Sequence, residues 1–213
     1  VGCLSGCSRP PPELVAVESG QFTMGSPLDE PGRDDDEAPH PVSLSRGFLL
    51  GRTELTRGEW RRVMRADAPG RDSWGDQHPA TVSWLEAVRY CNARSAREGL
   101  RSAYAISGPH DVRWDRDADG YRLPTEAEWA WATSQGGAPL KDRAWCGDND
   151  APGPQPVALK AASPRGFHDA IGNVEEWVWD RYGGFDAAPK VDPTGPAGGQ
   201  HRVARGGSYS DDQ

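Results

Sequence analysis

One acidic segment of this 213-residue chain has the residue types and spacing of a calcium-binding loop. Three aspartates, a glycine at the sixth place and a glutamate at the twelfth follow the pattern of an EF-hand: Asp115, Asp117, Asp119, Gly120 and Glu126. An EF-hand also needs a helix on each side, whereas residues 112–114 have the pattern of a strand and Pro124 lies inside the loop. A turn between a strand and a helix is therefore the simpler interpretation.

The N-terminal residues indicate lipid attachment. Residues 4–7 read Leu-Ser-Gly-Cys, which is typical of the bacterial lipobox, whose cysteine becomes lipidated. Three prolines follow at 10–12 and form a stiff tether. We therefore expect residues 1–12 to be a lipobox remnant with a Pro-rich tether, and Cys7 to be the lipidation site. This predicts a bacterial lipoprotein that is periplasmic or on the cell surface; the alternative is a disordered tail with incidental cysteines.

Two further cysteines, Cys91 and Cys146, lie outside this tail. Outside the cytoplasm, leftover cysteines commonly pair, so we expect a disulfide that ties the helix around Cys91 to the loop around Cys146. The alternative is two separate buried thiols, which behave as small hydrophobic side chains.

Charge and hydropathy exclude two classes of partner. Lys and Arg number 24 against 32 Asp and Glu, which gives a net charge of −8 and disfavours nucleic acid, whose phosphates are bound by Lys and Arg. No stretch reaches the roughly 20 apolar residues of a membrane-spanning helix, so we expect membrane contact only through a lipid anchor. The five histidines have no spacing typical of a zinc site.

Three segments have the chemistry that begins a helix and would position these groups. Thr or Ser followed three residues later by Glu forms a capping box, in which each side chain bonds the other residue's backbone N–H. Such pairs begin at Thr56, Ser83 and Thr125, with apolar residues after them at helical spacing. Short strands are expected at residues 14–18, 21–25, 42–44, 48–53, 176–180 and 201–205.

Composition indicates how the remainder folds. There are 26 Gly and 19 Pro without a repeat, only 36% hydrophobic residues, and nine Trp. Loops must therefore be long, and aromatic side chains must contribute much of the core. We predict one α+β domain over residues 13–213, loop-rich and low in regular secondary structure, and expect its C-terminus to be truncated because no element follows the last Gly-Gly turn.

Several ordered blocks resemble the formylglycine-generating-enzyme, or sulfatase-modifying-factor, family from about Glu13 onward. The matching segments are residues 20–25, 53–56, 78–84, 90–92, 120–129, 171–177 and 202–209. The resemblance implies a C-type-lectin-like fold.

The resemblance also bears on oxidation chemistry. Family members that convert a sulfatase cysteine to formylglycine have two cysteines just after the Gly-Gly-Ser turn, and such thiolates suit Cu(I). Here Asp211 occupies the first position and the second falls beyond Gln213. A carboxylate is a hard ligand and does not replace a thiolate for Cu(I). We therefore expect no catalytic residues, and copper only in the alternative that the chain is a formylglycine-generating oxidase.

A calcium site is implied by the same resemblance. Asp169 and Glu176 would supply carboxylates, and Gly172 and Val174 would supply backbone carbonyls, a donor set that Ca²⁺ prefers. Asp169 stands where relatives often have Asn. The alternative is a turn in which Asp169 bonds its own backbone.

Together these features predict an extracytoplasmic, non-catalytic binding or structural module that contains calcium. In C-type-lectin-like folds the loops near the chain's end commonly form the ligand surface. The candidate contacts with a small ligand or protein partner are Trp74, Trp145, Ser208, Tyr209 and Asp211. Besides the oxidase, a domain that partners an iron-dependent sulfoxide synthase is the remaining alternative.

Overall fold

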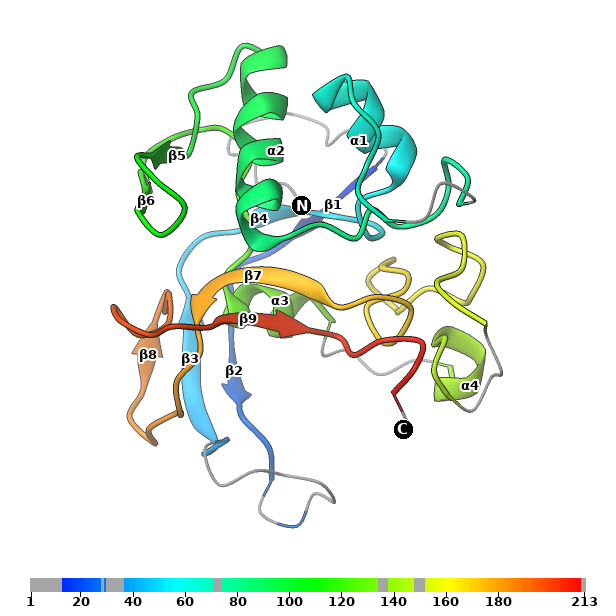
Figure 1. Cartoon of the computed structure of the whole chain (residues 1–213). Helices are drawn as coiled ribbons and strands as arrows, with labels where there is room; N and C mark the ends of the chain where they lie inside the picture. The colour runs from blue at the N-terminus through cyan, green and yellow to red at the C-terminus, as the bar shows by residue number, and fades with distance from the viewer. Residues whose placement is uncertain are drawn as a thin grey trace.

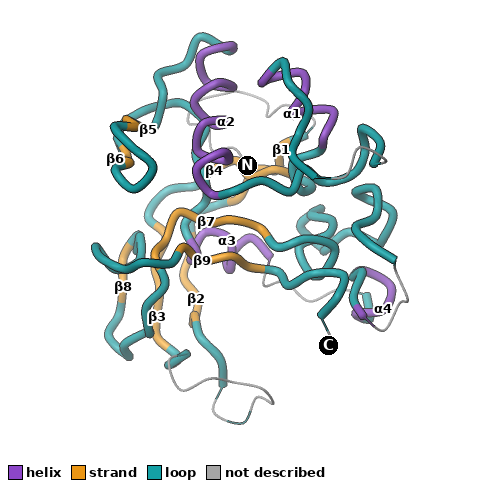
Figure 2. The backbone as a smooth tube through the Cα atoms, viewed as in Figure 1, coloured by secondary structure: helices purple, strands orange, loops and turns teal. Residues whose placement is uncertain are grey.

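The computed structural model describes residues 13–27, 29, 37–70, 74–133, 138–147 and 152–211. Its strands are β1 (Leu14–Val17), β2 (Gly20–Met24), β3 (His40–Leu44), β4 (Phe48–Gly51), β5 (Tyr104–Ile106), β6 (Val112–Trp114), β7 (Glu176–Arg181), β8 (Lys190–Val191) and β9 (Arg202–Arg205). Its helices are α1 (Arg57–Met64), α2 (Trp84–Arg97), α3 (Glu126–Thr133) and α4 (Leu140–Arg143). The predicted α+β, loop-rich architecture is confirmed, and loops make up much of the trace in Figure 2.

The strands form several small sheets rather than one large sheet. β1 pairs with β4, β5 with β6 and β7 with β9, all antiparallel, while β3 lies between antiparallel β2 and parallel β8. In Figure 1 the β7–β9 ribbon crosses the middle of the molecule, with α1 and α2 on one side of it. Helix α3 packs against β7 and β2. The β7–β9 ribbon therefore lies at the centre of the fold.

All three predicted capping boxes are present. In α1 and α2 the cap side chains of Thr56 and Ser83 accept from the third helical N–H, and the Glu three residues later accepts from the cap N–H. At the start of α3, Glu128 N donates to Thr125 Oγ1 at 3.1 Å and Thr125 N donates to Glu128 Oε2 at 2.8 Å. Local chemistry thus fixes where each helix begins.

Aromatic side chains fill much of the core, as the composition predicts. The ring of Trp179 on β7 lies 5.6 Å from that of Trp84 and 5.2 Å from that of Tyr104. The Arg202 guanidinium lies 3.7 Å from the Trp84 ring centroid, and Trp84 Nε1 donates to the Val178 carbonyl at 3.0 Å. These ring contacts and the hydrogen bond from the Trp84 indole to the β7 backbone therefore fix β7 against the start of α2.

The EF-hand-like segment is a turn, as its context indicates. Asp115 Oδ1 accepts from the Asp117 N–H at 3.0 Å, and Asp119 Oδ1 accepts from the Arg101 N–H at 2.8 Å. Strand β6 precedes the turn, and Glu126 is the first residue of α3. Two of the aspartates therefore accept hydrogen bonds from backbone N–H groups, one within the turn and one before β5.

The predicted disulfide is wrong, because the buried Cys91 and Cys146 side chains do not form a disulfide with each other. Cys91 packs on the core side of α2 with Leu14 and Val88, and burial raises its pKa to about 12. Cys146 lies in the loop after α4, beside the bridge between Trp145 and Gly172. The two sulfurs belong to different parts of the fold.

Two further points concern membranes. Cys7 and the tether at 1–12 lie outside the described residues. No helix in the described part of the chain has both the length and the apolar character needed to cross a membrane.

One glycine provides a test of the packing between α2 and the turn before α3. A Cβ on Gly120 would lie 2.2 Å from the Arg101 carbonyl oxygen and 2.5 Å from Ser95 Oγ. We expect Gly120→Ala to lower the free energy of unfolding by about 3 kcal/mol, because buried backbone must move. Gly108→Ala, where a Cβ meets nothing within 4 Å, should change it by less than about 0.5 kcal/mol. Urea unfolding measures both; equal effects would contradict the packing described.

Candidate functional site

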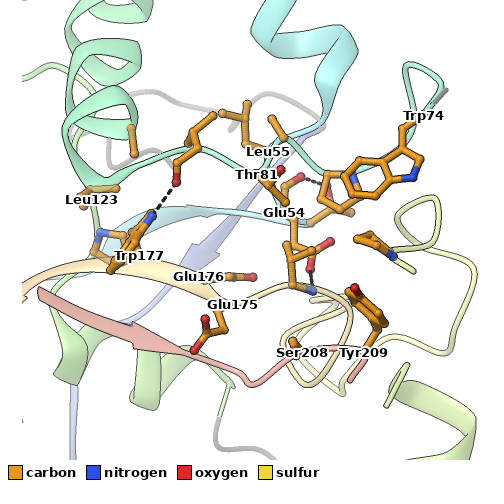
Figure 3. Close-up of a pocket in the computed structure, with 18 residues that line it drawn as sticks. Glu54, Leu55, Trp74, Thr81, Leu123, Glu175, Glu176, Trp177, Ser208 and Tyr209 are labelled. Atoms are coloured by element: carbon orange, nitrogen blue, oxygen red, sulfur yellow. Dashed lines mark hydrogen bonds between the residues drawn. The ribbon is translucent and has the colours of Figure 1, made fainter. Parts of the chain in front are cut away.

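A cavity of about 500 Å³ lies where the start of β7, the segment before α2 and the last turn of the chain meet (Figure 3). Its lining includes Glu54, Leu55, Trp74, Thr81, Val82, Leu123, Pro154, Val174, Glu175, Glu176, Trp177, Ser208 and Tyr209. A cavity of this size and mixed character is typical of a small-molecule or side-chain binding site.

The walls of the cavity are aromatic and aliphatic. In Figure 3, Trp177 and Leu123 lie on one side, and Trp74 and Tyr209 on the opposite side. Trp177 Nε1 donates to the Val82 carbonyl at 2.8 Å, which fixes the indole ring in place. The walls can therefore hold an apolar or aromatic group between them.

The floor is acidic, and its central group is Glu54, which is 5% exposed. Its Oε1 accepts from the Val174 N–H at 2.9 Å and its Oε2 from Asn173 Nδ2 at 2.7 Å. Burial, followed by the charges of Glu176 and Asp169, raises the pKa of Glu54 well above its usual value. Glu54 thus joins the segment before α1 to the loop at residues 169–176.

Two more carboxyls lie on that loop. Glu176 Oε2 accepts from Trp129 Nε1 at 2.8 Å, and Asp169 Oδ2 accepts from the Ala158 N–H at 2.7 Å. The pKa values of both Asp169 and Glu176 are raised, mainly because the carboxyls are shielded from water. Asp169 Oδ1 is buried and accepts no hydrogen bond within the described residues. Three carboxyls that affect one another therefore lie around a single loop.

The backbone of the loop is wound tightly. Asp169, Gly172 and Asn173 have φ values of 57°, 77° and 57°. The Gly172 N–H donates to the Gly206 carbonyl and the Asn173 N–H to the Trp145 carbonyl, each at 2.8 Å. A Cβ at Gly172 would lie 1.9 Å from the Trp145 carbonyl oxygen, so only glycine fits there.

Asp211 holds the Gly-Gly-Ser turn. Its Oδ2 accepts from the Ser208 N–H at 2.7 Å, and its carbonyl accepts from the Gly147 N–H at 3.0 Å. The carboxylate thus closes its own turn, and it is exposed.

The predicted ligand surface is assembled in part. Trp74, Ser208 and Tyr209 line the cavity, whereas Asp211 and Trp145 do not. The Trp145 ring packs instead under the Lys160 ammonium group, 4.3 Å from its centroid. Glu54, Thr81 and Trp177 also line the cavity but were not predicted to do so. The available signals were an acid two residues before the Thr56 capping box and a Trp next to Glu176.

The family model described as "Sulfatase-modifying factor enzyme 1-like domain" matches residues 4–213. This chain belongs to that family. The sulfatase-modifying-factor chain is 30% identical over 218 residues to "Chaperone protein LppX" of Paenibacillus barcinonensis, a match that covers 83% of this chain and 74% of that protein. It is also 30% identical over 251 residues to "Formylglycine-generating enzyme" of Streptomyces coelicolor, covering 92% and 78%.

Solved structures give the same fold. "Treponema denticola variable protein 1" superposes with a TM-score of 0.81 and 29% identity, covering 93% of this chain and 84% of that one. The predicted C-type-lectin-like fold of formylglycine-generating enzymes is thus confirmed. The chain also matches the chlamydial proteins named "Serine/threonine-protein kinase pkn1", and there the match covers 33% of each kinase's own length.

The donor set of the loop fits the calcium ion that the family resemblance implies. Asp169 Oδ1 is a buried oxygen without a hydrogen bond, and an oxygen ligand in this state suits Ca²⁺. Within the described ranges, no cluster of three or more His, Cys, Asp or Glu side chains is arranged to hold a metal. The ion would therefore also need backbone carbonyls, which the predicted ligands Gly172 and Val174 would have to supply.

Glu54 provides a test of how the loop is held. We expect Glu54→Ala to destabilise the protein by about 2–3 kcal/mol in calcium-containing buffer, because it leaves buried N–H donors without acceptors. Glu175→Ala removes a neighbouring exposed carboxylate and should cost less than about 0.5 kcal/mol. Urea denaturation measures both variants. A Glu54→Ala protein as stable as the control would show that this carboxylate does not hold the loop.

Proposed function

We propose that this domain is a non-catalytic binding module that holds a ligand or a partner's side chain in the aromatic cavity and carries calcium in the loop at its floor. The observation that carries the proposal is Asp211, which stands in the position of the first oxidase cysteine and bonds the Ser208 N–H at 2.7 Å. A group engaged in closing a turn, and hard in character, does not serve as a Cu(I) ligand.

The cavity supports the binding role. Opposed aromatic walls and a few fixed polar groups are the usual composition of a ligand site. Trp177 and Glu54 are fixed by hydrogen bonds before any ligand arrives, which lowers the entropic cost of binding. The relative named a chaperone protein and the similar variable protein are both consistent with a module that recognises another molecule.

Calcium has a structural role in this proposal. Glu54 and Asp169 are buried and Glu176 is half-buried, and the neighbouring carboxyl charges raise the cost of ionising Glu54 and Glu176. A cation bound by Asp169, Glu176 and the carbonyls of Gly172 and Val174 would offset that cost. Since Glu176 begins β7, the ion would fix the strand that carries Trp177.

We further propose that the domain works outside the cytoplasm, attached by a lipid on Cys7. The support is the Leu-Ser-Gly-Cys sequence and the proline-rich segment after it. Mass spectrometry of the N-terminal peptide from the producing bacterium identifies the lipid.

The cavity is tested by filling it. Thr81 is exposed and lines the cavity, so Thr81→Trp should block it without burying a new group in the core. We expect aromatic fragments such as indole to bind the wild type in saturation-transfer NMR and to bind Thr81→Trp at least about tenfold more weakly. Thr23→Trp, at an exposed position of β2 away from the cavity, is the matched control. Indole signals that are equal in all three proteins would contradict a binding cavity here.

The oxidase alternative is tested by direct assay. We expect no aldehyde by mass spectrometry when a cysteine peptide derived from a sulfatase is incubated with the protein, Cu(I) and oxygen, because the hard carboxylate of Asp211 stands where the first thiolate ligand would be. The formylglycine-generating enzyme of Streptomyces coelicolor serves as the positive control. Copper-dependent aldehyde formation at a comparable rate would overturn the non-catalytic assignment.

A further inference from the structure

A second cavity, of about 320 Å³, lies at the other end of β7 from the site in Figure 3. The start of α3, the end of β7 and the loop between β7 and β9 surround it, near β3 and β8 in Figure 1. Its lining includes Met24, His40, Glu126, Asp180, Phe185 and Pro193. None of these residues lines the aromatic cavity, so the two sites are separate.

Glu126 is a buried carboxylate without a hydrogen bond. The residue is 8% exposed, and no hydrogen bond to its carboxylate occurs within the described part of the chain. The nearest cation, Arg205 Nη1, lies 3.6 Å from Oε1, which is longer than a hydrogen bond. Glu126 also lines the adjoining hollow beside β9. The Glu126 carboxylate therefore borders two hollows and can still accept hydrogen bonds, although it forms a long ion pair with Arg205.

Asp180 lies beside it and is 3% exposed. Its Oδ2 accepts from the backbone N–H of Glu126 at 2.9 Å. Burial, together with the Glu126 and Glu128 charges, raises the pKa of Asp180 to about 7, and burial also raises the pKa of Glu126. Two adjacent buried carboxyls are costly, and such arrangements concentrate at functional sites.

Most of the basic side chains around the cavity are engaged elsewhere. Lys190 pairs with Asp186 at 2.7 Å, and the Arg181 guanidinium donates to the Gly199 carbonyl. Arg202 stacks on Trp84 and donates to the Trp179 carbonyl. Arg205 forms a long ion pair with Glu126 at 3.6 Å, and His40 in the cavity wall also lies near this carboxylate. Glu126 therefore has one distant ion pair but no direct hydrogen bond from a cation within the described residues.

The remaining wall is apolar. The Phe185 ring lies 4.9 Å from that of His40, tilted by 59°, and Met24 and Pro193 adjoin it. An aromatic face attracts an ammonium group as well as an apolar body. The cavity therefore combines acceptors for a cation with a surface for hydrocarbon.

We propose that this cavity is a second binding site, for a small organic ammonium ion whose N–H groups bond Glu126 and Asp180 and whose apolar body packs on Phe185. A metal ion fits less well, because no cluster of three or more His, Cys, Asp or Glu side chains in the described residues is arranged to hold one. An ammonium group brings its own donors and needs fewer ligands.

The test compares benzylamine with benzyl alcohol, which has a similar shape and no charge, by isothermal titration at pH 8. We expect the wild type to bind benzylamine at least about tenfold more tightly than the alcohol, since charged hydrogen bonds are made only by the amine. Glu126→Gln should weaken benzylamine binding about tenfold or more, and Asp180→Asn should do the same by removing the second carboxylate.

Glu18→Gln is the control, because it changes the net charge equally at an exposed residue that lines neither cavity. It should leave benzylamine binding unchanged. The proposal is overturned if the wild type binds amine and alcohol equally. It is also overturned if Glu126→Gln and Asp180→Asn both bind the amine as tightly as the wild type does. A loss in Glu18→Gln as large as in those variants would also overturn it, since the effect would then be one of overall charge. Two independent variants keep the result decisive if one of them fails to fold.

Discussion

Burial of the carboxyls around residues 169–176 is the constraint on which the rest of this structure depends. Taking an ionised carboxyl out of water is costly unless donors or a cation surround it. Glu54 is supplied by two N–H donors, and Glu176 by one indole N–H. Asp169 retains a buried oxygen without a donor. In the proposed function, a bound cation would complete this arrangement by giving that oxygen a partner.

The loop in turn positions both walls of the aromatic cavity. It runs directly into β7, which carries Trp177, and the Asn173 carbonyl accepts from the Tyr209 N–H at 2.9 Å. The opposing aromatic residues are therefore fixed relative to each other through one short segment. At the Gly-Gly-Ser turn, the Asp211 carboxylate closes the backbone. The proposed function depends on the resemblance that puts the first oxidase thiolate at this position, within a fold that the chain shares with its family.

Features set by local chemistry could be predicted from the sequence, and features set by distant contacts could not. The helix starts at Thr56, Ser83 and Thr125 follow from pairs three residues apart, and the strands around Val42 and Trp177 follow from short apolar patterns. Strand β8 was missed because its two residues pair only with β3, far away in the chain. Glu54 was missed as a site residue because its partner Asn173 lies 119 residues away. The predicted cysteine pairing was wrong because sequence spacing does not show which part of the core each side chain joins. Cys91 packs in the hydrophobic cluster that also contains Leu14 and Val88.

The most direct test of the central claim is a crystal structure of the protein grown with saturating calcium chloride. The account predicts one ion bound by Asp169 Oδ1, the Glu176 carboxylate and the carbonyls of Gly172 and Val174, at the Ca–O distances of about 2.3–2.6 Å typical of Ca²⁺. Anomalous scattering identifies the element. A loop of unchanged shape that contains only water, with Asp169 Oδ1 bonded to that water, would contradict the account.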